Sequence, residues 1–260
     1  MKYGFIGCGN MGGALIRAAA KKTKDIMIAD FDTEKAKTLA KELGVAVGEN
    51  REIAQKCDRI FLGVKPQVMA DMLDGIKNIL NEKKPVLISM AAGLTTNRIK
   101  DFAGDMPIIR IMPNTPVSVG EGVILYCSNG VSDEVVNDFV IDMQYSGKLY
   151  SIDENLMDAG CSVSGCGPAF MYTFASAVAK GGEECGLSKS QAIEFAAATM
   201  AGAAKMLLTS NKTPDELTSA VCSKGGSTIE GVTVLKNSDF ENIVVDCIKA
   251  AYKRNKELGK

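Results

Sequence analysis

Residues 7–12 read Gly7-Cys8-Gly9-Asn10-Met11-Gly12, and this GCGNMG stretch decides the predicted fold because of what surrounds it. It follows an apolar, strand-like segment at residues 2–6 and opens a helical pattern, which is the context in which G-x-G-x-x-G binds a dinucleotide. Gly7 permits the tight turn, Gly9 lets the backbone approach a pyrophosphate, and Gly12 lets the helix pack against its strand. The helix N–H groups then face the phosphates. The alternative is a glycine-rich turn that binds nothing.

Short apolar runs alternate with amphipathic stretches through the first part of the chain. Strands are predicted at residues 2–6, 25–29, 45–47, 59–64, 85–90, 108–112, 122–126 and 148–152. Helical patterns lie between several of them, for example at residues 11–20 and at residues 33–43, which Gly44 ends. Continuous apolar strands that alternate with helices are typical of a mostly parallel, doubly wound sheet. Residues 1–155 are therefore predicted to form a Rossmann-type α/β domain that binds a dinucleotide.

The strand pattern ends at about Asp153, and only helical patterns follow it. They cover residues 168–184, residues 191–208 with Ser188 as N-cap, a third helix opened by Thr213 and Pro214, and residues 239–258. Residues 156–260 are therefore predicted to form an all-α domain. Its run at residues 195–204 has few large side chains on any face, so this helix packs by close backbone approach. We favour a dimer interface for the run over burial within one chain.

The composition excludes several classes of partner. The 260 residues carry 30 Lys and Arg against 31 Asp and Glu, and no basic run indicates a nucleic-acid partner. No apolar run approaches the ~20 residues of a membrane span, and the N-terminus lacks the features of a signal peptide. The eight cysteines are scattered and form no C-x-x-C. We therefore expect a cytoplasmic protein with reduced thiols, no bound metal and no membrane partner.

The chain contains no histidine. This excludes histidine as a general acid, as a member of a catalytic triad and as a metal ligand. Any chemistry must therefore use hydroxyls, lysines, carboxylates, backbone groups or a cofactor.

Candidate cofactor contacts lie where the predicted strands end, because doubly wound sheets bind ligands at their carboxyl edge. The second strand ends in Asp30, which suits the adenosine ribose hydroxyls and repels a 2′-phosphate, so NADH is favoured over NADPH. Two alternatives stay open: Asp30 is a solvated loop residue, or Lys35 and Lys37 assist a phosphate. Later strands end in turns rich in Pro, Gly or small residues, which indicate a lined cleft: Val64-Lys65-Pro66, Ala91-Ala92-Gly93 and residues 110–116.

A second unusual stretch, Ser223-Lys224-Gly225-Gly226-Ser227-Thr228, interrupts the helical second half. Two adjacent glycines cost a helical region roughly 1 kcal/mol each relative to alanine. In return they allow a turn that exposes backbone N–H groups at the start of the next helix, which is an anion site. The alternative is a helix-breaking loop with a Ser or Thr N-cap.

Six segments, in their order and spacing, resemble the pyrroline-5-carboxylate reductase family over essentially the whole chain. They are GFIGCGNMGGA at residues 4–14, LGVKPQ at 62–67, SMAAG at 89–93, RIMPNTP at 110–116, SGCGPAF at 164–170 and SKGGSTIEGV at 223–232. The resemblance implies a Rossmann domain followed by a helical domain that interlaces with a second subunit, giving a homodimer. Assembly of such dimers into a larger ring is left open. It also implies that NAD(P)H reduces the C=N bond of 1-pyrroline-5-carboxylate to L-proline.

The resemblance and the strand ends together assign the site residues. The predicted cofactor-binding residues are Ile6, Gly7, Cys8, Gly9, Asn10, Met11, Gly12, Asp30, Asn50, Val64, Lys65, Pro66 and Ala92. The predicted substrate-binding residues are Ser223, Gly226, Ser227 and Thr228. Two positions depart from the family: Cys166 stands where a serine is common, and Asp30 stands where many members have small or basic residues suited to NADPH.

The chemistry that the resemblance implies needs no strong protein acid. An imine nitrogen is basic enough to be protonated before or during hydride arrival, and the cofactor supplies the hydride. We expect the backbone at Gly226 and Ser227, with the Ser227 hydroxyl, to hold the substrate carboxylate. Thr228 is the predicted catalytic residue, which bonds the ring nitrogen and helps to deliver its proton. Lys224 is assigned no catalytic role.

Two other classes of protein share parts of this pattern. Hydroxyacid dehydrogenases and imine reductases share the Rossmann-plus-helices plan, but the hydroxyacid enzymes place a catalytic lysine with a nearby asparagine on an interdomain helix. Residues 165–182 offer only Lys180 and no such pair. A nucleotide sensor without catalytic activity would bind the cofactor through the same glycine loop and turn over no imine.

Overall fold

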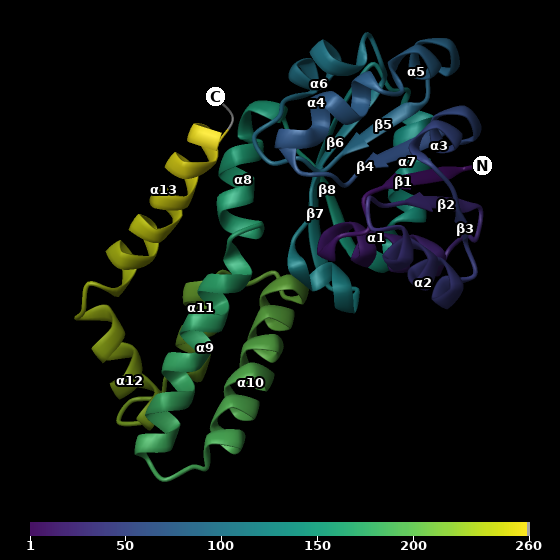
Figure 1. Cartoon of the computed structure of the whole chain (residues 1–260). Coiled ribbons are helices and arrows are strands. Elements are labelled where there is room, and N and C mark those ends of the chain that lie inside the picture. Colours follow the sequence, from purple (N-terminus) through teal and green to yellow (C-terminus); the bar gives the residue numbers. More distant parts are fainter. Residues whose placement is uncertain (259–260) are drawn as a thin grey trace. The chain divides into compact units, whose positions relative to one another are not determined.

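The computed structural model describes residues 1–258 and contains two compact units (Figure 1). The first comprises Met1–Cys166 together with residues 251–258 of the last helix, and the second is Gly167–Ala250. The first unit holds all the strands, and the second is made only of helices. The predicted change from alternating strands and helices to helices alone is therefore confirmed.

An eight-stranded sheet forms the centre of the first unit, in the order β3-β2-β1-β4-β5-β6-β7-β8. The strands are β1 Tyr3–Ile6, β2 Ile26–Ala29, β3 Ala46–Val47, β4 Arg59–Leu62, β5 Val86–Ser89, β6 Ile108–Met112, β7 Gly122–Asn129 and β8 Gly147–Ser151. Every neighbouring pair is parallel except β6 and β7. All eight predicted strands are confirmed. β7 runs past its predicted end because Asn129 still pairs with Ile108, at the start of β6.

Helices cover both faces of this sheet (Figure 1). They are α1 Asn10–Ala20, α2 Thr33–Leu43, α3 Asn50–Lys56, α4 Pro66–Asp74, α5 Lys77–Lys83, α6 Thr96–Ala103 and α7 Asp133–Asp142, with α8 Met157–Ser164 after the last strand. Short 3₁₀ turns lie at η1 Thr115–Val119, η2 Gln144–Ser146 and η3 Glu154–Leu156. Alternate strand residues face opposite ways, so Phe5 packs in the cluster of α1, α2 and α7, whereas Ile6 packs with α3 to α6. The doubly wound fold predicted from the sequence is confirmed.

Three backbones meet closely where β1 runs into α1. Gly7 has a φ of 106°, and a Cβ placed there would lie 2.6 Å from the carbonyl oxygen of Gly63, the residue that follows β4. A Cβ on Gly12 would collide with the Gly7 carbonyl oxygen. A Cβ on Gly9, in contrast, would meet no atom within 4 Å. Gly7 and Gly12 are therefore needed for the fold itself, and Gly9 leaves open space above the loop.

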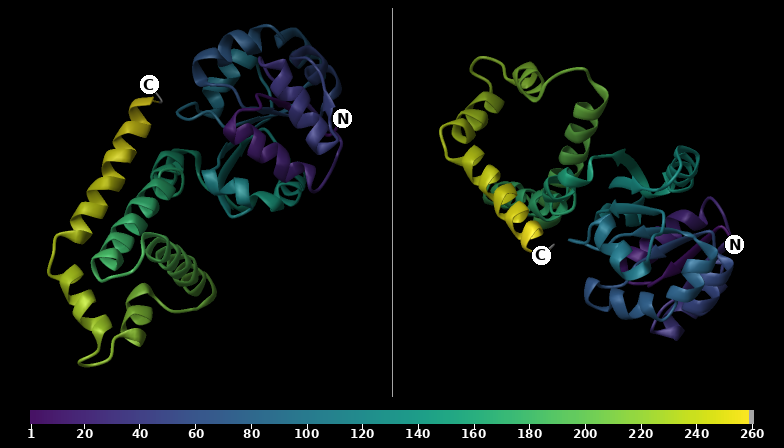
Figure 2. Two further views of the ribbon diagram at one scale, coloured as in Figure 1. Left: turned by 60° about the horizontal axis from the view of Figure 1, so that its bottom comes forward. Right: turned by 90° about the horizontal axis from the view of Figure 1, so that it is seen from above.

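The second unit contains α9 Gly167–Glu184, α10 Lys189–Thr209, α11 Pro214–Val221, α12 Ser227–Lys236 and most of α13 Phe240–Leu258 (Figure 2). Ser188 and Thr213 form capping boxes at the starts of α10 and α11, which confirms both predicted N-caps. α9 and α10 pack closely through a small cluster of Ala179, Ala192 and Ala196. Alanines at this contact bring the two helix backbones together, as the small residues of α10 predict.

This helical unit has almost no core of its own. α11, α12 and α13 contribute no buried residue. Many large apolar side chains are exposed instead, among them Met171, Tyr172, Phe174, Val178, Leu187, Ile193, Phe195, Met206, Leu207, Leu208, Val221, Val234, Leu235, Phe240, Ile243, Val244 and Val245. α10 has the length and composition of a membrane-crossing helix, so the expectation that no apolar run approaches a membrane span was wrong for this segment. An apolar surface of this extent indicates an interaction site.

The close contact at Gly12 predicts a stability effect that its neighbour does not share. Gly12→Ala is expected to lower the free energy of unfolding by roughly 2–3 kcal/mol, because the new methyl group must displace backbone rather than a flexible side chain. Gly9→Ala, the matched control, is expected to cost less than about 1 kcal/mol because its methyl group enters open space. Urea denaturation of both variants measures the difference, and equal losses would contradict the assignment of the contact.

Candidate active site

The predicted cofactor residues lie at one edge of the sheet. β3, β2, β1, β4, β5 and β6 are parallel, so their carboxyl ends meet at this edge. The glycine loop follows β1, Asp30 follows β2, the Val64–Pro66 turn comes just after β4, and Ala92 comes just after β5. Asn50 opens α3, after β3. The strand order reverses between β1 and β4, where doubly wound folds form the crevice that receives a dinucleotide.

The predicted residues divide by exposure. Ile6, Gly7, Cys8 and Gly12 are buried and build the loop from beneath. Asn10, Lys65 and Ala92 are exposed at the edge, and Gly9 and Met11 are half-buried. Because α1 begins at Asn10 with no side-chain cap, its first N–H groups stay available to an anion. Any contact that the buried residues make with a cofactor is therefore through backbone groups.

Asp30 has a role that the sequence analysis missed. Its carboxylate accepts a hydrogen bond from the Cys8 N–H at 2.5 Å and another from the Asp32 N–H at 2.9 Å. The residue thus ties the turn after β2 to the glycine loop. A carboxylate has about four acceptor positions, so Asp30 keeps the capacity to bind ribose hydroxyls.

The two lysines near Asp30 are placed differently. The Lys37 Nζ atom lies 2.7 Å from the Glu34 carboxylate, one turn back on α2. Lys35 lines a cavity of about 240 Å³ together with Cys8 and Arg17. Lys35 is therefore the lysine nearer to the glycine loop.

The Cys8 thiol is structural. It is buried and donates a hydrogen bond to the Ala29 carbonyl oxygen at 3.6 Å. Burial raises the pKa of Cys8 to about 11, and the nearby charge of Asp30 adds to the effect. At neutral pH this residue is a neutral thiol and a poor nucleophile.

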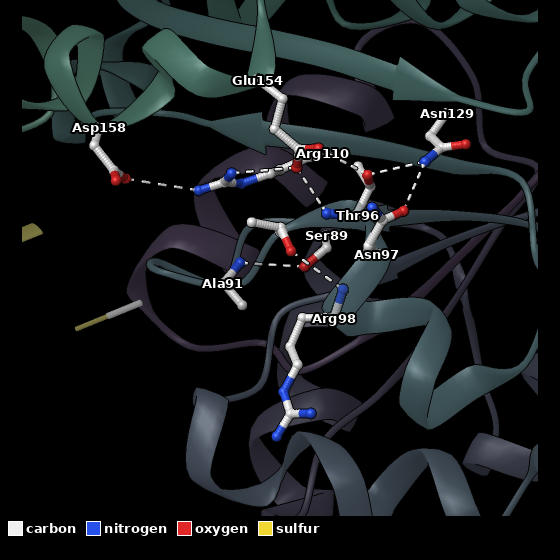
Figure 3. Close-up of polar contacts among 10 residues, drawn as sticks. Ser89, Ala91, Thr96, Asn97, Arg98, Arg110, Asn129, Glu154 and Asp158 are labelled. Atoms are coloured by element: carbon white, nitrogen blue, oxygen red, sulfur yellow. Dashed lines mark hydrogen bonds and ion pairs between the residues drawn. The ribbon is translucent and has the colours of Figure 1, made fainter. Parts of the chain in front are cut away.

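A buried charge network lies beside the loop that contains Ala92 (Figure 3). Arg110, in β6, is 2% exposed, and its Nη1 atom lies 3.3 Å from a carboxylate oxygen of Glu154. The Glu154 carboxylate also accepts hydrogen bonds from the Thr96 N–H at 2.7 Å and the Thr96 hydroxyl at 2.8 Å. Asn129 donates to the same hydroxyl at 3.1 Å. The network therefore joins β6, η3 and the start of α6.

This network holds the loop after β5 at its far end. Thr96 is the first residue of α6, and Ala91-Ala92-Gly93 lies a few residues before it. At the near end of the loop, the Ala91 N–H donates to the Ser89 hydroxyl at 3.3 Å (Figure 3). The predicted cofactor contact at Ala92 thus lies on a loop that is anchored on both sides.

Sequence reasoning missed both charged residues of the network. Arg110 was included in a predicted strand, a predicted turn and a family segment but was given no role, although an arginine in the apolar run of residues 108–112 was a signal of a buried charge. Glu154 gave no signal, because its partners Thr96 and Arg110 are distant in sequence. Within residues 1–258, the Nε atom of Arg110 has no hydrogen-bond partner.

The predicted substrate residues gather at the start of α12, in the second unit. Gly225 has a φ of 73°, and the Gly226 N–H donates to the Ser223 carbonyl oxygen at 3.0 Å, which closes a tight turn. Gly226 is the N-cap, and no side chain caps the helix. The alternative of a Ser or Thr N-cap is therefore wrong. The hydroxyl-bearing residues Ser223, Ser227 and Thr228 are exposed.

The uncapped start of α12 contrasts with its neighbours. α10 and α11 both begin with capping boxes that use the first backbone N–H groups. At α12 the N–H groups of the first turn are left for another partner, next to two exposed hydroxyls. This arrangement suits a small carboxylate.

A doubly wound sheet with a glycine loop of this kind, followed by a helical unit, defines a class of dinucleotide-dependent oxidoreductases. A family model for pyrroline-5-carboxylate reductase dimerisation matches residues 154–258, and one for coenzyme F420-dependent NADP oxidoreductases matches residues 2–93. The pyrroline-5-carboxylate reductase of Aquifex aeolicus is 35% identical over 99% of this chain and 97% of its own length. The chain belongs to the pyrroline-5-carboxylate reductase family.

Two solved structures agree with this assignment. A pyrroline-5-carboxylate reductase from Coxiella burnetii matches with a TM-score of 0.94 at 30% identity, covering 100% of this chain and 98% of that one. The Plasmodium falciparum enzyme, solved with NADP bound, matches with a TM-score of 0.86 at 30% identity and the same coverage. The resemblance drawn from the motifs is confirmed. The chain is an NAD(P)-dependent oxidoreductase, and the hydroxyacid dehydrogenase and sensor alternatives are wrong.

The family also accounts for the exposed apolar helices. The matched dimerisation region, residues 154–258, contains α9 to α13. The side chains that find no core within one chain therefore belong to the interface of a homodimer. The length and composition of α10 need no membrane to explain them.

The charge network predicts that Glu154 stabilises the first unit. Glu154→Ala removes the acceptor at the start of α6 and leaves the Arg110 guanidinium without its nearer carboxylate. We expect the free energy of unfolding to fall by roughly 2 kcal/mol, less than for a fully buried pair because the Glu154 side chain is 30% exposed. Asp158→Asn is the control, since its carboxylate lies 3.9 Å from Arg110 and should contribute under about 0.5 kcal/mol. Urea denaturation distinguishes them, and a Glu154→Ala protein as stable as Asp158→Asn would contradict the network's role.

Proposed function

We propose that this chain reduces the C=N bond of 1-pyrroline-5-carboxylate to L-proline with NAD(P)H, as the final step of proline biosynthesis. The observation that carries the proposal is the full-length match to reductases of this name, which covers both units. The glycine loop at the sheet edge and the uncapped start of α12 supply the two kinds of binding site that the reaction requires.

The cofactor is proposed to lie across the carboxyl edge of the sheet, on the thirteen residues predicted from the sequence. The open space above Gly9 fits a pyrophosphate that approaches the backbone, and the first N–H groups of α1 suit its charge. Bound NAD(P)H supplies the hydride. Asp30 and Asn50 are proposed to contact the adenosine side, and Val64, Lys65, Pro66 and Ala92 the strand ends beyond the loop.

The preference for NADH over NADPH is proposed on electrostatic grounds. Asp30 brings a carboxylate to the position where a 2′-phosphate would lie, with Asp32 and Glu34 close behind it. Lys37 forms an ion pair with Glu34, so it is less available to bind a phosphate. The Plasmodium falciparum relative binds NADP, so the relative rates with the two cofactors are the direct test.

The substrate is proposed to bind at the start of α12. The N–H groups of Gly226 and Ser227, with the Ser227 hydroxyl, hold its carboxylate, and Ser223 closes the turn beside it. The Gly226 N–H bonds the Ser223 carbonyl in the free chain, so Ser227 offers the readier donor. The Thr228 hydroxyl bonds the ring nitrogen. The imine carbon gains the hydride and the nitrogen gains a proton, which Thr228 helps to deliver from solvent.

The assembly and cellular setting complete the proposal. Residues 1–155 serve the cofactor, and residues 156–260 serve the substrate and the homodimer. Assembly of dimers into a larger ring and a cytoplasmic location, with no nucleic-acid, membrane or metal partner, are also part of the proposal.

Thr228 is the residue whose removal tests the site. The wild-type chain is expected to oxidise NADH when pyrroline-5-carboxylate is added, and more slowly NADPH. Thr228→Val keeps the shape but lacks the hydroxyl, so turnover should fall by roughly ten- to a thousandfold, the range between one lost hydrogen bond and one lost proton donor. Absorbance of the reduced cofactor measures both rates.

Two variants serve as controls for this experiment. Thr228→Ser restores the hydroxyl and should recover most of the turnover. Thr233→Val changes the same residue type on the same helix, where the hydroxyl only bonds back to the Ile229 carbonyl oxygen. Wild-type turnover in Thr228→Val would refute the role of Thr228, and no turnover in the wild type would refute the proposed reaction.

The dimer has a test of its own. Phe195, on α10, is 53% exposed in the single chain, and Phe195→Glu would place an unpaired charge in the proposed interface. Sedimentation should find wild-type particles of at least twice the 27.6 kDa chain, more where dimers join into a ring, and Phe195→Glu particles of one chain. Tyr145→Glu, which changes a similarly exposed aromatic residue in η2, should leave the dimer intact. A dimeric Phe195→Glu protein would place the interface elsewhere.

A further inference from the structure

We propose that Phe31 is a cofactor-binding residue, on whose ring the adenine base of the dinucleotide stacks. The inference rests on the proposed function, because it takes the carboxyl edge of the sheet as the cofactor site. Phe31 follows Asp30 directly and is 106% exposed, so its ring touches almost nothing in the chain. Neither the family motifs nor the sequence analysis pointed to it.

The exposure of Phe31 comes from a turn that is fixed on both sides. Asp30 bonds the Cys8 N–H on the glycine loop and the Asp32 N–H across the turn. Asp32 in turn caps α2 by accepting a hydrogen bond from the Lys35 N–H at 3.1 Å. The backbone that carries Phe31 is therefore held between the glycine loop and the first turn of α2. Its ring is presented outward by this anchored turn.

Other exposed aromatic residues of the first unit differ from Phe31. Tyr145 and Tyr150 are 45% and 44% exposed, so about half of each side chain packs against the protein. Both also carry a hydroxyl that interacts well with water. A phenyl ring without a polar group gains from any flat apolar partner that covers it. A ligand that covers Phe31 therefore removes more apolar surface from water than one that covers either tyrosine.

The position of Phe31 in the fold indicates which ligand would cover its ring. In doubly wound folds the acidic residue at the end of the second strand lies beside the adenosine ribose. The base attached to that ribose then lies within reach of the adjacent residue in the turn. A purine offers a flat π-face, and stacking of a base on an aromatic side chain is a common and sequence-tolerant mode of binding. The occupant that fits is therefore the adenine of the cofactor.

Phe31 and Asp30 would then bind different parts of the same adenosine: Phe31 the base and Asp30 the ribose. Stacking on Phe31 involves no charge, so it strengthens NADH and NADPH alike. Asp30 acts on the ribose and discriminates between them by its repulsion of a 2′-phosphate. A change at Phe31 should weaken both cofactors by a similar factor and leave their ratio unchanged.

The test compares a complete cofactor with one that lacks adenosine. Reduced nicotinamide mononucleotide carries the same reactive ring but no adenine. For Phe31→Ala we expect the Kd for NADH, measured by fluorescence of the reduced cofactor, to rise about five- to thirtyfold. The KM for NADH should rise in parallel while kcat at saturation stays within about twofold. The KM for reduced nicotinamide mononucleotide should not change, and Phe31→Trp should keep wild-type affinity for NADH.

Ile141→Ala is the matched control, since it truncates an apolar side chain that is 54% exposed on α7, away from the glycine loop. Its neighbour Asp142 bonds Tyr3, the first residue of β1, at the opposite edge of the sheet. An unchanged Kd for NADH in Phe31→Ala would overturn the inference, as would a loss with reduced nicotinamide mononucleotide as large as the loss with NADH. The binding measurement needs no pyrroline-5-carboxylate, so its outcome is independent of whether the wild type reduces that substrate.

Discussion

The contact among the backbones of Gly7, Gly12 and Gly63 is the constraint on which the rest of the molecule depends. With no side chain at these positions, α1 can begin directly above the ends of β1 and β4. That approach fixes where the first N–H groups of α1 point and where the crevice between the two strands lies. The same contact explains why the loop can stay narrow beneath Gly9 while leaving free space above it. The close approach of these three glycines therefore determines both the packing of α1 on the sheet and the shape of the proposed cofactor site.

Charged groups then hold the loops around this crevice in place. Asp30 connects the turn after β2 to the glycine loop, and Glu154 connects the loop after β5 to β6 through Arg110. Burying an arginine is costly, and an apolar side chain at position 110 would avoid that cost. What the arginine adds is direction, because a carboxylate held by Arg110 and bonded to Thr96 sets the start of α6. Such groups fix a loop more precisely than apolar packing does.

Local sequence patterns were enough to predict the fold. Contacts between residues distant in sequence became known only from the structure. Apolar periodicity and the glycine loop were enough for eight strands and the long helices, because these signals lie within a few neighbouring residues. The bond from Cys8 to Asp30 and the pairing of Arg110 with Glu154 could not be predicted, since each joins segments that only the folded sheet brings together. The start of α12 could be predicted only in part. The glycines predicted a turn, but only the structure shows that no side chain bonds the first N–H groups of the helix. The full exposure of Phe31 had no sequence signal at all.

The small core of the helical unit links catalysis to assembly. α12 buries no residue within one chain, so little in that chain holds its first turn in a set direction. Residues 154–258 match a dimerisation domain, so we expect the second chain to cover the apolar surfaces of this region and to support α12 as well. A hydride transfer needs its two partners aligned within a few tenths of an ångström, which a helix without packing does not provide. We therefore expect the dimer interface to do more than stabilise the protein, since the proposed substrate site depends on it for a fixed shape.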